Sequence, residues 1–290
     1  MSKKPYQSSP GKFLTSLVEF KEDEIKKALS GYDVRYEFKT WRSLQFADYL
    51  TKWLPEVCLK ANELVSIDQF NMDEKIKKAI KRVHDSTSID IPTVVAETIL
   101  HAVLRHSFES EPIACKLFSS GDEGTRSFGN AHIIHTDGGD ELWLGRSSII
   151  SANTFEQMVE NIGGEINQIL EPEILKQEKE ILVSLREPQH LLPTDLEDAL
   201  NLGTPFDDLL KKVCLPVLVA YDSDILGSGF VEQYEDALKS EVLSNYSILK
   251  AALPDKIEEY DLRLHVFLIP IESVQNLTQQ FSTKIGPVPL

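Results

Sequence analysis

Cysteine is scarce in this sequence, and the few cysteines are widely separated. The 290 residues contain three, at positions 58, 115 and 214. No two of them have the C-x-x-C spacing of a zinc site, and an odd, sparse set does not build a disulfide framework. Each stands among apolar neighbours, which predicts small buried side chains. This usage is typical of a reducing compartment, so we expect a cytoplasmic protein.

Long apolar runs are also missing. No stretch approaches the ~18 uncharged apolar residues that identify a transmembrane helix. The first residues, MSKKPYQSSPGKF, carry positive charge without the apolar segment of a signal peptide. The sequence therefore predicts no association with a membrane.

The common nucleotide-binding and hydrolase motifs are absent as well. There is no G-x-x-x-x-G-K-[ST] phosphate loop, no G-x-G-x-x-G after a strand, no H-E-x-x-H and no G-x-S-x-G. Two histidines, His132 and His135, would face opposite sides of a strand, and His101 and His106 would diverge on a helix. These absences argue against ATP hydrolysis by this chain and against a zinc site.

Negative charge dominates, but it is unevenly distributed. The net charge is -16, yet residues 1–82 hold 16 Lys and Arg against 12 Asp and Glu. Residues 83–290 hold 14 and 34, a balance of -20. So acidic a surface repels the phosphate backbone of nucleic acid. We therefore expect any contact with DNA to run mainly through a partner or through the basic N-terminal part.

Residues 1–90 are predicted to form an N-terminal mixed α/β extension that is partly basic. The patterns predict strands over 13–20 and 33–38, a short charged helix over 21–31, and helices over 41–65 and 73–84. The last helix carries a basic run that either forms a solvated face or binds phosphate or a partner: Lys75, Lys77, Lys78, Lys81 and Arg82. The polar stretch DSTSID, residues 85–90, marks the predicted boundary.

Residues 91–290 are predicted to form the core, with a helical insertion at about 171–212. Pro92 opens an amphipathic helix, and strand-like segments follow at 113–119, 131–135, 141–150, 213–221 and 260–271. Helices are predicted to begin near 151, 230 and 272. Pro216 interrupts an apolar run, so we expect an edge strand or a bulge there. The mixed order of elements predicts an α/β fold in which a mixed sheet is flanked by helices.

The segment FGNAHIIHTDGGDELWLGRSSII, residues 128–150, is predicted to be a β-hairpin, because the glycines of TDGGD supply the positive φ angles of a tight turn. The order helix, strand, hairpin, helix, strand matches the core of PD-(D/E)XK nucleases. Their chemistry needs an acid on the first hairpin strand, and an acid and a lysine two residues apart on the second. The two-residue spacing puts the acid and the lysine of the second strand on one face of the sheet. The acids hold Mg²⁺, which activates water.

The chain from about Pro92 to Ile271 resembles the HamA family, the effector subunit of the Hachiman anti-phage system. The similarity is carried by the order of several segments: AETILHAVLRH, GNAHI, ELWLGRSS and CLPVLVAYDSD. The resemblance implies a PD-(D/E)XK-like nuclease core and a partner, the superfamily-2 helicase HamB. It also implies that an N-terminal region belongs to the same protein.

The sequence departs from the family at the residues that matter for catalysis. Where the family has G-x-D on the first strand, this chain has Ala131 in place of the acid. Where it has L-G-E-x-K, the acid is replaced by Arg146 and the lysine by Ser148. Arginine cannot bind Mg²⁺ and places a permanent positive charge where the cation would sit. Glu97, on the first helix of the core, is retained.

Three interpretations follow. In the first, the chain is a degenerate nuclease fold that binds a helicase or nucleic acid, with Arg146 contacting a phosphate or forming an ion pair with Glu97. In the second, it is an active metal-dependent nuclease that uses Mg²⁺ at moved carboxylates: Glu97, Asp137, Asp140 or Glu141. In the third, it is only an interaction subunit. Because both the metal ligand and the lysine are lost, we favour the first and third, which require no cofactor.

Overall fold

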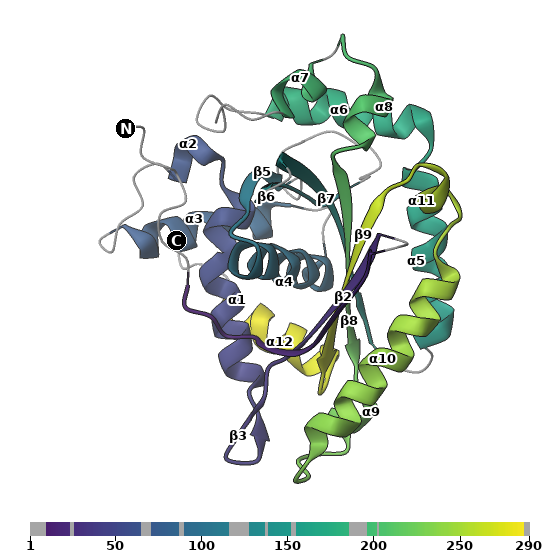
Figure 1. The fold of residues 1–290 in the computed structure, drawn as a ribbon. Coiled ribbons are helices and arrows are strands. Elements are labelled where there is room, and N and C mark those ends of the chain that lie inside the picture. Colours follow the sequence, from purple (N-terminus) through teal and green to yellow (C-terminus); the bar gives the residue numbers. More distant parts are fainter. Residues whose placement is uncertain are drawn as a thin grey trace.

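The computed structural model describes residues 10–23, 26–64, 71–86, 90–115, 128–136, 139–151, 155–185, 196–201 and 203–286. Its main feature is a 7-stranded mixed sheet in the order β1-β2-β9-β8-β7-β6-β5 (Figure 1). The strands β2, β9, β8 and β7 run parallel to one another, and antiparallel pairs extend both ends. This confirms the predicted α/β fold with a mixed sheet flanked by helices. The nuclease-like core remains a prediction.

The bounds of the strands follow from local alternation and from pairing. The described strands are β1 Thr15–Glu22, β2 Lys27–Asp33, β3 Tyr36–Glu37, β4 Thr40–Trp41, β5 Glu111–Cys115, β6 Asn130–Thr136, β7 Gly139–Ile150, β8 Val213–Asp222 and β9 Arg263–Ile271. The short β3 and β4 form a separate two-stranded hairpin.

The helices begin at capping residues in several cases; Asp90, for example, accepts a hydrogen bond from the backbone N–H of Thr93 at the start of α4. The described helices are α1 Ser43–Cys58, α2 Ala61–Leu64, α3 Met72–Asp85, α4 Ile91–Ser107, α5 Phe155–Ile169, α6 Pro172–Leu185, α7 Leu196–Leu200, α8 Phe206–Leu210, α9 Asp224–Gly227, α10 Tyr234–Ala252, α11 Lys256–Glu259 and α12 Val274–Lys284.

Helices cover the sheet on both faces (Figure 1). On one side α1, α4 and α12 pack against each other and against the sheet, and we name this side the α4 face. On the other side α5 and α10 pack together and enclose a second apolar core with α6. We name this side the α5 face. Because side chains alternate along each strand, neighbouring residues of the β6–β7 hairpin belong to different faces.

The N-terminal residues contribute to the same sheet as the rest of the chain. Strand β2 pairs in parallel with β9, and β1 pairs with β2 to form one edge. Helix α1 packs against α4 and α12. The predicted division at residue 90 and the insertion at about 171–212 stay predictions about independent folding units.

Two sequence-based expectations in these regions are wrong. The charged helix predicted over 21–31 is instead the end of β1 and the strand β2, because pairing with β9 outweighs the local helical propensity. Of the strand predicted over 33–38, only the end of β2 and the short β3 form. The helices predicted over 41–65 and 73–84 are confirmed by α1, α2 and α3.

Pro216 was expected at a sheet edge or in a bulge, but it lies inside β8, a central strand between β7 and β9. Its partner on β9 is His265. The pairing between β7 and β8 includes Cys214 and then resumes at Val217, so it skips the proline. The missing N–H is thus tolerated, because the ladder on the β7 side is interrupted where the proline stands.

Within the part of the chain that the structure describes, no helix combines the length and the apolar character needed to cross a membrane.

Candidate functional site at the β6–β7 hairpin

The predicted hairpin is confirmed: β6 and β7 pair in antiparallel register from Asn130–Gly145 to Thr136–Gly139. Gly139 has a φ of 111°, which favours glycine, and its carbonyl oxygen accepts a hydrogen bond of 2.6 Å from the Thr136 hydroxyl. Strand β7 continues inward and pairs with β8. The hairpin therefore lies between the central parallel strands and the edge strand β5.

On the α4 face, Glu97 of α4 meets Asn130 of β6. Both side chains are buried, and the Asn130 amide donates a hydrogen bond to the Glu97 carboxylate. The same amide nitrogen lies 3.4 Å from the Glu97 backbone oxygen. A Cβ atom at Gly129 would overlap the Glu97 carboxylate. The Gly129–Asn130 pair is thus shaped to hold this carboxylate against the start of β6.

The other three predicted site residues lie on the α5 face. Ala131 is fully buried in the core beneath α5. Arg146 and Ser148 pair with Val217 and Val219 of β8, which belong to the same core. Ala131, Arg146 and Ser148 thus share one face, as the family pattern requires. Glu97 does not join them, because it approaches the hairpin from the opposite side.

The expectation that Arg146 pairs with Glu97 is wrong. The Arg146 guanidinium forms an ion pair with Glu165 of α5, and Arg146 and Glu165 are 23% and 48% exposed. The sheet separates Arg146 from Glu97, since strand alternation directs Asn130 and Arg146 to different faces. The sequence contains no local signal for Glu165, which is 19 positions away on the next helix.

The residues at the positions where the resemblance implies a metal site do not fit Mg²⁺. They offer a methyl group at Ala131, a guanidinium at Arg146 and a hydroxyl at Ser148. Mg²⁺ needs oxygen ligands with negative charge, and the guanidinium is a permanent cation that cannot act as a ligand. The carboxylate that contacts Arg146, that of Glu165, neutralises the guanidinium.

The carboxylates proposed for a moved site are engaged in separate interactions. Asp140 lies 2.6 Å from the Nδ1 of His135, across the hairpin. Glu141 accepts a hydrogen bond of 2.9 Å from the Trp143 indole and forms an ion pair with Arg263. As neighbours on a strand, Asp140 and Glu141 point to opposite faces.

The moved carboxylates are also far from Glu97. Asn130, which holds Glu97, and Ile134, which pairs with Glu141, are separated along β6 by roughly 13 Å at about 3.3 Å per residue. The described ranges contain no group of three or more His, Cys, Asp or Glu residues arranged to hold a metal ion. Asp137 lies outside the described residues.

Next to the Glu97–Asn130 pair, the α4 face contains a buried polar network that the sequence did not predict. Glu56 of α1 accepts a hydrogen bond of 2.9 Å from Arg105 and lies 3.0 Å from the Nε2 of His101. Ser110 lies 2.8 Å from the Nδ1 of His132. The rings of His101 and His132 are 5.1 Å apart and completely buried. The strand period could have placed His132 beside Asn130, but no sequence pattern indicates Glu56.

Burial sets the protonation of this network. Burial lowers the pKa of His101 despite the Glu56 carboxylate, and it lowers the pKa of His132 far more. Burial alone would raise the pKa of Glu56, but hydrogen bonds from His101 and Arg105 and the positive charge of Arg105 hold this pKa below its usual value. The network therefore contains neutral histidines and an ionised glutamate paired with Arg105.

The remaining candidates have structural roles in the described residues. Asp222 accepts a hydrogen bond of 2.5 Å from the backbone N–H of Val274 at the start of α12. Ser223 caps the short helix α9, which begins at Asp224. In the basic run of α3, Lys78 and Arg82 both form ion pairs with Glu63, whereas Lys77 and Lys81 are exposed.

Comparison with known proteins places this fold in a family. A model of the HamA family matches residues 11–285. A curated relative, Anti-bacteriophage protein A of Escherichia coli (strain K12), is 28% identical over 255 residues, which are 88% of this chain and 47% of that protein. The chain thus spans about half the length of the curated relative it matches. Since the family model covers almost all of the sequence, the chain belongs to the HamA family.

Proposed function

We propose that this protein acts in defence against bacteriophage, as the non-helicase subunit of a complex with a HamB-like superfamily-2 helicase, and that its hairpin does not cleave DNA by metal-dependent chemistry. Membership of the HamA family and the name of the relative, Anti-bacteriophage protein A, support the defence role. The missing phosphate loop and the acidic charge of residues 83–290 support the assignment of ATP hydrolysis and DNA binding to a partner. The helicase would supply ATP hydrolysis and most of the DNA contact.

The observation that carries the proposal is the Arg146–Glu165 ion pair on the α5 face. It occupies the place where the family pattern puts an acid and a lysine, and it is flanked by Ala131 and Ser148. At this site the one carboxylate of the pair, Glu165, is neutralised by the Arg146 guanidinium, and no lysine stands at position 148 to assist a nucleophile. What remains on this face is a charged, partly accessible surface suited to contact with a partner.

The alternative function is an active metal-dependent DNA nuclease that uses moved carboxylates. Glu97 is the observation in its favour, because a helical glutamate is retained beside the hairpin. Against it, Asn130 holds Glu97 on the α4 face, and Asp140 and Glu141 interact with His135 and Arg263 instead. This alternative therefore requires several of these contacts to rearrange.

The partner is tested by co-expression with a HamB-like helicase. We expect the two chains to co-purify at fixed stoichiometry and to reduce phage plaque formation only when both are present. A matched control replaces the helicase with a variant that lacks its phosphate-loop lysine, which should still co-purify but should not protect. A stable monomer that is indifferent to the helicase would refute the complex.

The activity is tested by incubating the purified complex with plasmid DNA in Mg²⁺ or Mn²⁺. We expect no cleavage. Cleavage that depends on metal and disappears in Glu97→Ala or Asp140→Ala would establish the alternative.

A restored site gives a complementary test. Ala131→Asp, Arg146→Glu and Ser148→Lys together place two acids and a lysine on one face of adjacent strands, with the acids at diagonal positions about 7–8 Å apart. We expect metal-dependent cleavage in this variant and none in the isosteric control Ala131→Asn, Arg146→Gln, Ser148→Lys. Folding of both variants is checked by circular dichroism, because Ala131 is fully buried.

A further inference from the structure

Strand β1 forms an open edge of the large sheet. It pairs with β2 on one side, and no described strand pairs with its other side. The part of β1 from Val18 to Glu22 keeps a regular register with β2, after an irregularity between Ser16 and Val18. An edge strand of this kind presents unpaired backbone N–H and C=O groups that can accept a further strand.

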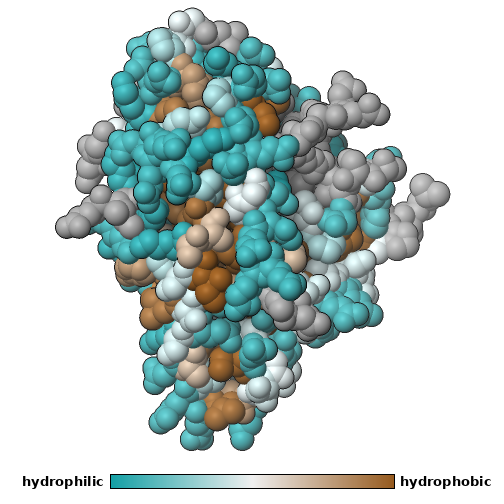
Figure 2. All heavy atoms as spheres, turned by 90° about the vertical axis from the view of Figure 1, so that its right-hand side faces the viewer, coloured by the Kyte–Doolittle hydropathy of each residue, from teal (hydrophilic) through white to brown (hydrophobic). Residues whose placement is uncertain are grey.

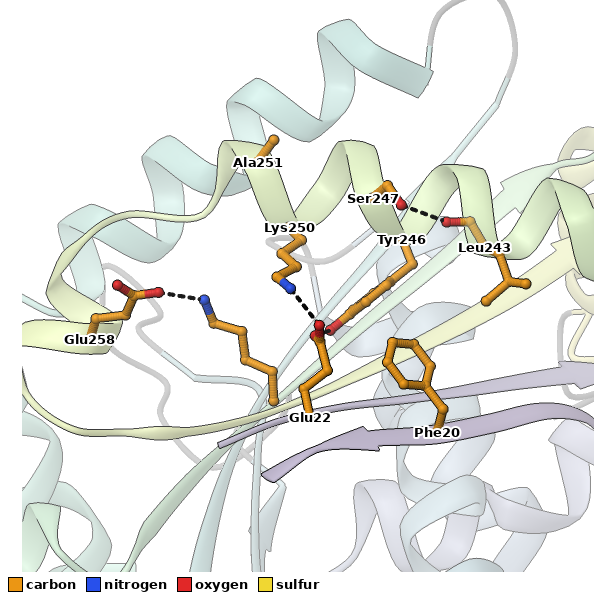
Figure 3. A pocket seen from close by; sticks show the side chains of 9 residues that line it. Phe20, Glu22, Leu243, Tyr246, Ser247, Lys250, Ala251 and Glu258 are labelled. Carbon is orange, nitrogen blue, oxygen red and sulfur yellow. Dashed lines mark hydrogen bonds and ion pairs between the residues drawn. The ribbon is translucent and has the colours of Figure 1, made fainter. Parts of the chain in front are cut away.

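A pocket of about 570 Å³ lies beside this edge, between β1 and helix α10 (Figure 3). Phe20 and Glu22 of β1 point to it from below, and Leu243, Tyr246 and Lys250 of α10 line it from above. Leu243 is 42% exposed, although it is a large apolar residue. Figure 2 looks onto the side that carries α10 and shows apolar side chains gathered between hydrophilic borders.

The two ends of this groove differ in chemistry. Phe20 and Leu243 form an apolar end. The rest of the lining includes two lysines, Lys27 and Lys250, each paired with a glutamate. Lys250 and the Tyr246 hydroxyl donate hydrogen bonds of 2.6 and 2.8 Å to Glu22. The hydrogen bond from Lys250, reinforced by that from Tyr246, lowers the pKa of Glu22 against the effect of burial.

Lys27 is the distinctive residue of the charged end. Its side chain is only 8% exposed, so burial of its stem fixes the direction of the ammonium group. Its partner Glu258, at 2.7 Å, is 67% exposed. An exposed carboxylate in such a pair contributes little to stability, so a carboxylate from another molecule can replace it. The cation is thus preorganised, and the anion that neutralises it is exchangeable.

We propose that the β1 edge and the adjacent groove bind an extended segment of a partner protein, which adds to the sheet as a strand next to β1. The segment has an apolar side chain that packs between Phe20 and Leu243. Two positions further along, it has an acidic side chain or a terminal carboxylate that meets Lys27 and Lys250. The spacing of two follows from Phe20 and Glu22, because side chains two apart on a strand share a face.

The chemistry of the groove favours this occupant over others. Nucleic acid presents phosphates without the apolar side chain that the Phe20–Leu243 end requires. A small free anion would use the lysines but neither the apolar end nor the strand edge. An extended peptide uses all three features.

The test uses fluorescein-labelled octapeptides of alternating threonine and valine, in which one leucine is followed two positions later by glutamate. The control peptide has the same composition, but the glutamate is moved by one position, which turns it to the opposite face. Fluorescence anisotropy gives the affinity, and hydrogen exchange gives the location. We expect saturable binding of the first peptide, at least roughly tenfold weaker binding of the control, and protection of amides in residues 15–22.

Two protein variants sharpen the test. Leu243→Asp should weaken binding by about tenfold, because it places a charge in the apolar end, whereas Ile181→Asp, at a similarly exposed position of α6, should not. Glu258→Gln should strengthen binding several-fold, because it removes the carboxylate that competes for Lys27. The control Glu156→Gln, at an exposed position of α5, should leave the affinity unchanged.

Several results would overturn the proposal. These are equal affinity for both peptides, no binding at about 1 mM peptide, or protection outside β1 and α10. Inorganic phosphate could displace the peptide while Leu243→Asp still weakens peptide binding. This result would show that the groove contains an anion subsite beside the apolar end, and it would support the proposal. Phosphate binding in the absence of any peptide binding refutes it. A dimer of this chain that Leu243→Asp dissociates would assign the groove to a second copy instead.

Discussion

The two faces of one hairpin differ in how much freedom their polar groups have. On the α4 face, Glu97, His101, Asn130 and His132 are all at most 3% exposed and interact with one another or with Glu56, Arg105 and Ser110. On the α5 face, the polar pair of Arg146 and Glu165 is partly open to water.

This difference in burial determines which polar residues can be substituted without destabilising the fold. Buried polar groups must keep their partners, because an unsatisfied charge or donor in the interior costs several kcal/mol. Partly exposed groups can change without that penalty. Arg146 and Ser148, where the resemblance implies an acid and a lysine, lie on the tolerant face, whereas Glu97 lies on the face where it is enclosed. Four experiments can break or sharpen this contrast.

The largest effect is expected for Glu56→Ala on the α4 face. Removing this carboxylate takes the anionic partner from Arg105, which keeps a neutral partner in the Ser110 carbonyl, and from the buried Nε2 of His101. We therefore expect a loss of about 3–5 kcal/mol in the free energy of unfolding. Urea denaturation measures it. Glu56→Gln keeps an acceptor and should cost clearly less. Equal stability of Glu56→Ala and the wild type would show that the network is not enclosed.

Gly129→Ala is expected to cost roughly 3 kcal/mol, the upper end of typical overpacking penalties, because its Cβ would overlap the Glu97 carboxylate. The matched substitution is Gly164→Ala in α5, where no atom lies within 4 Å of an added Cβ. This control should be neutral or stabilising by up to about 1 kcal/mol, as expected for alanine in a helix. Thermal unfolding of both variants measures the two changes in stability. Similar losses of stability in Gly129→Ala and Gly164→Ala would contradict the predicted difference between the two faces.

Acid should destabilise the α4 face through its histidines. Burial lowers the pKa of His265 to about 3, and His265 stacks on Phe267 with ring centroids 4.3 Å apart. Since the pKa is about 6.5 in the unfolded chain, stability is complete above pH 6.5 and is lost as the pH falls toward 3. From pH 7 to pH 5 this group alone should cost about 2 kcal/mol.

The acid effect is measured by urea denaturation of the wild type and of His265→Gln at both pH values. The variant lacks the titrating group, so its loss between pH 7 and pH 5 should be smaller by about 2 kcal/mol. An identical loss in both proteins would assign the acid sensitivity to other groups, such as His101 and His132.

The smallest effect is expected for Glu165→Ala on the α5 face. Because Glu165 is 48% exposed, its ion pair with Arg146 should contribute less than about 1 kcal/mol. The difference in stability between the wild type and this variant should shrink as the salt concentration rises, because salt screens an exposed ion pair. A loss comparable to that of Glu56→Ala would show that the two faces are equally constrained, and the contrast would fail.

The sequence predicted the elements whose periodicity is strong. The helix that begins near Pro92, the β6–β7 hairpin and the apolar strand before Asp222 were all recognised, because their patterns leave little choice. Residues 27–31 were wrongly assigned to a helix, since KKALSG has helical propensity and becomes a strand only by pairing with its neighbours in the sheet. Pro216 was expected at an edge or in a bulge. The sequence does not reveal the gap in the β7–β8 hydrogen-bond ladder that allows a proline in this central strand.

For the candidate site, the sequence predicted that Arg146 and Ser148 share a face, and the structure confirms this. That these residues replace a family acid and lysine stays a prediction. The sequence did not predict which helix covers which face, so Arg146 was assigned to Glu97 and not to Glu165. Nor did it indicate that Glu56 enters the interior beside His101, since that contact joins residues 45 positions apart. Such pairings depend on tertiary packing, and no local sequence pattern indicates them.

The parallel pairing of β2 with β9 has a consequence for biogenesis. Asp33 ends β2 and Arg263 begins β9, so 230 positions separate the two strands. At a synthesis rate of roughly 5–20 residues per second, the ribosome adds this length in no less than about 10 s. During that time the first hairpin has no neighbour on the side that β9 will occupy. We expect chaperones that protect open strand edges to be needed most during this interval, and ribosome stalling before β9 to favour aggregation.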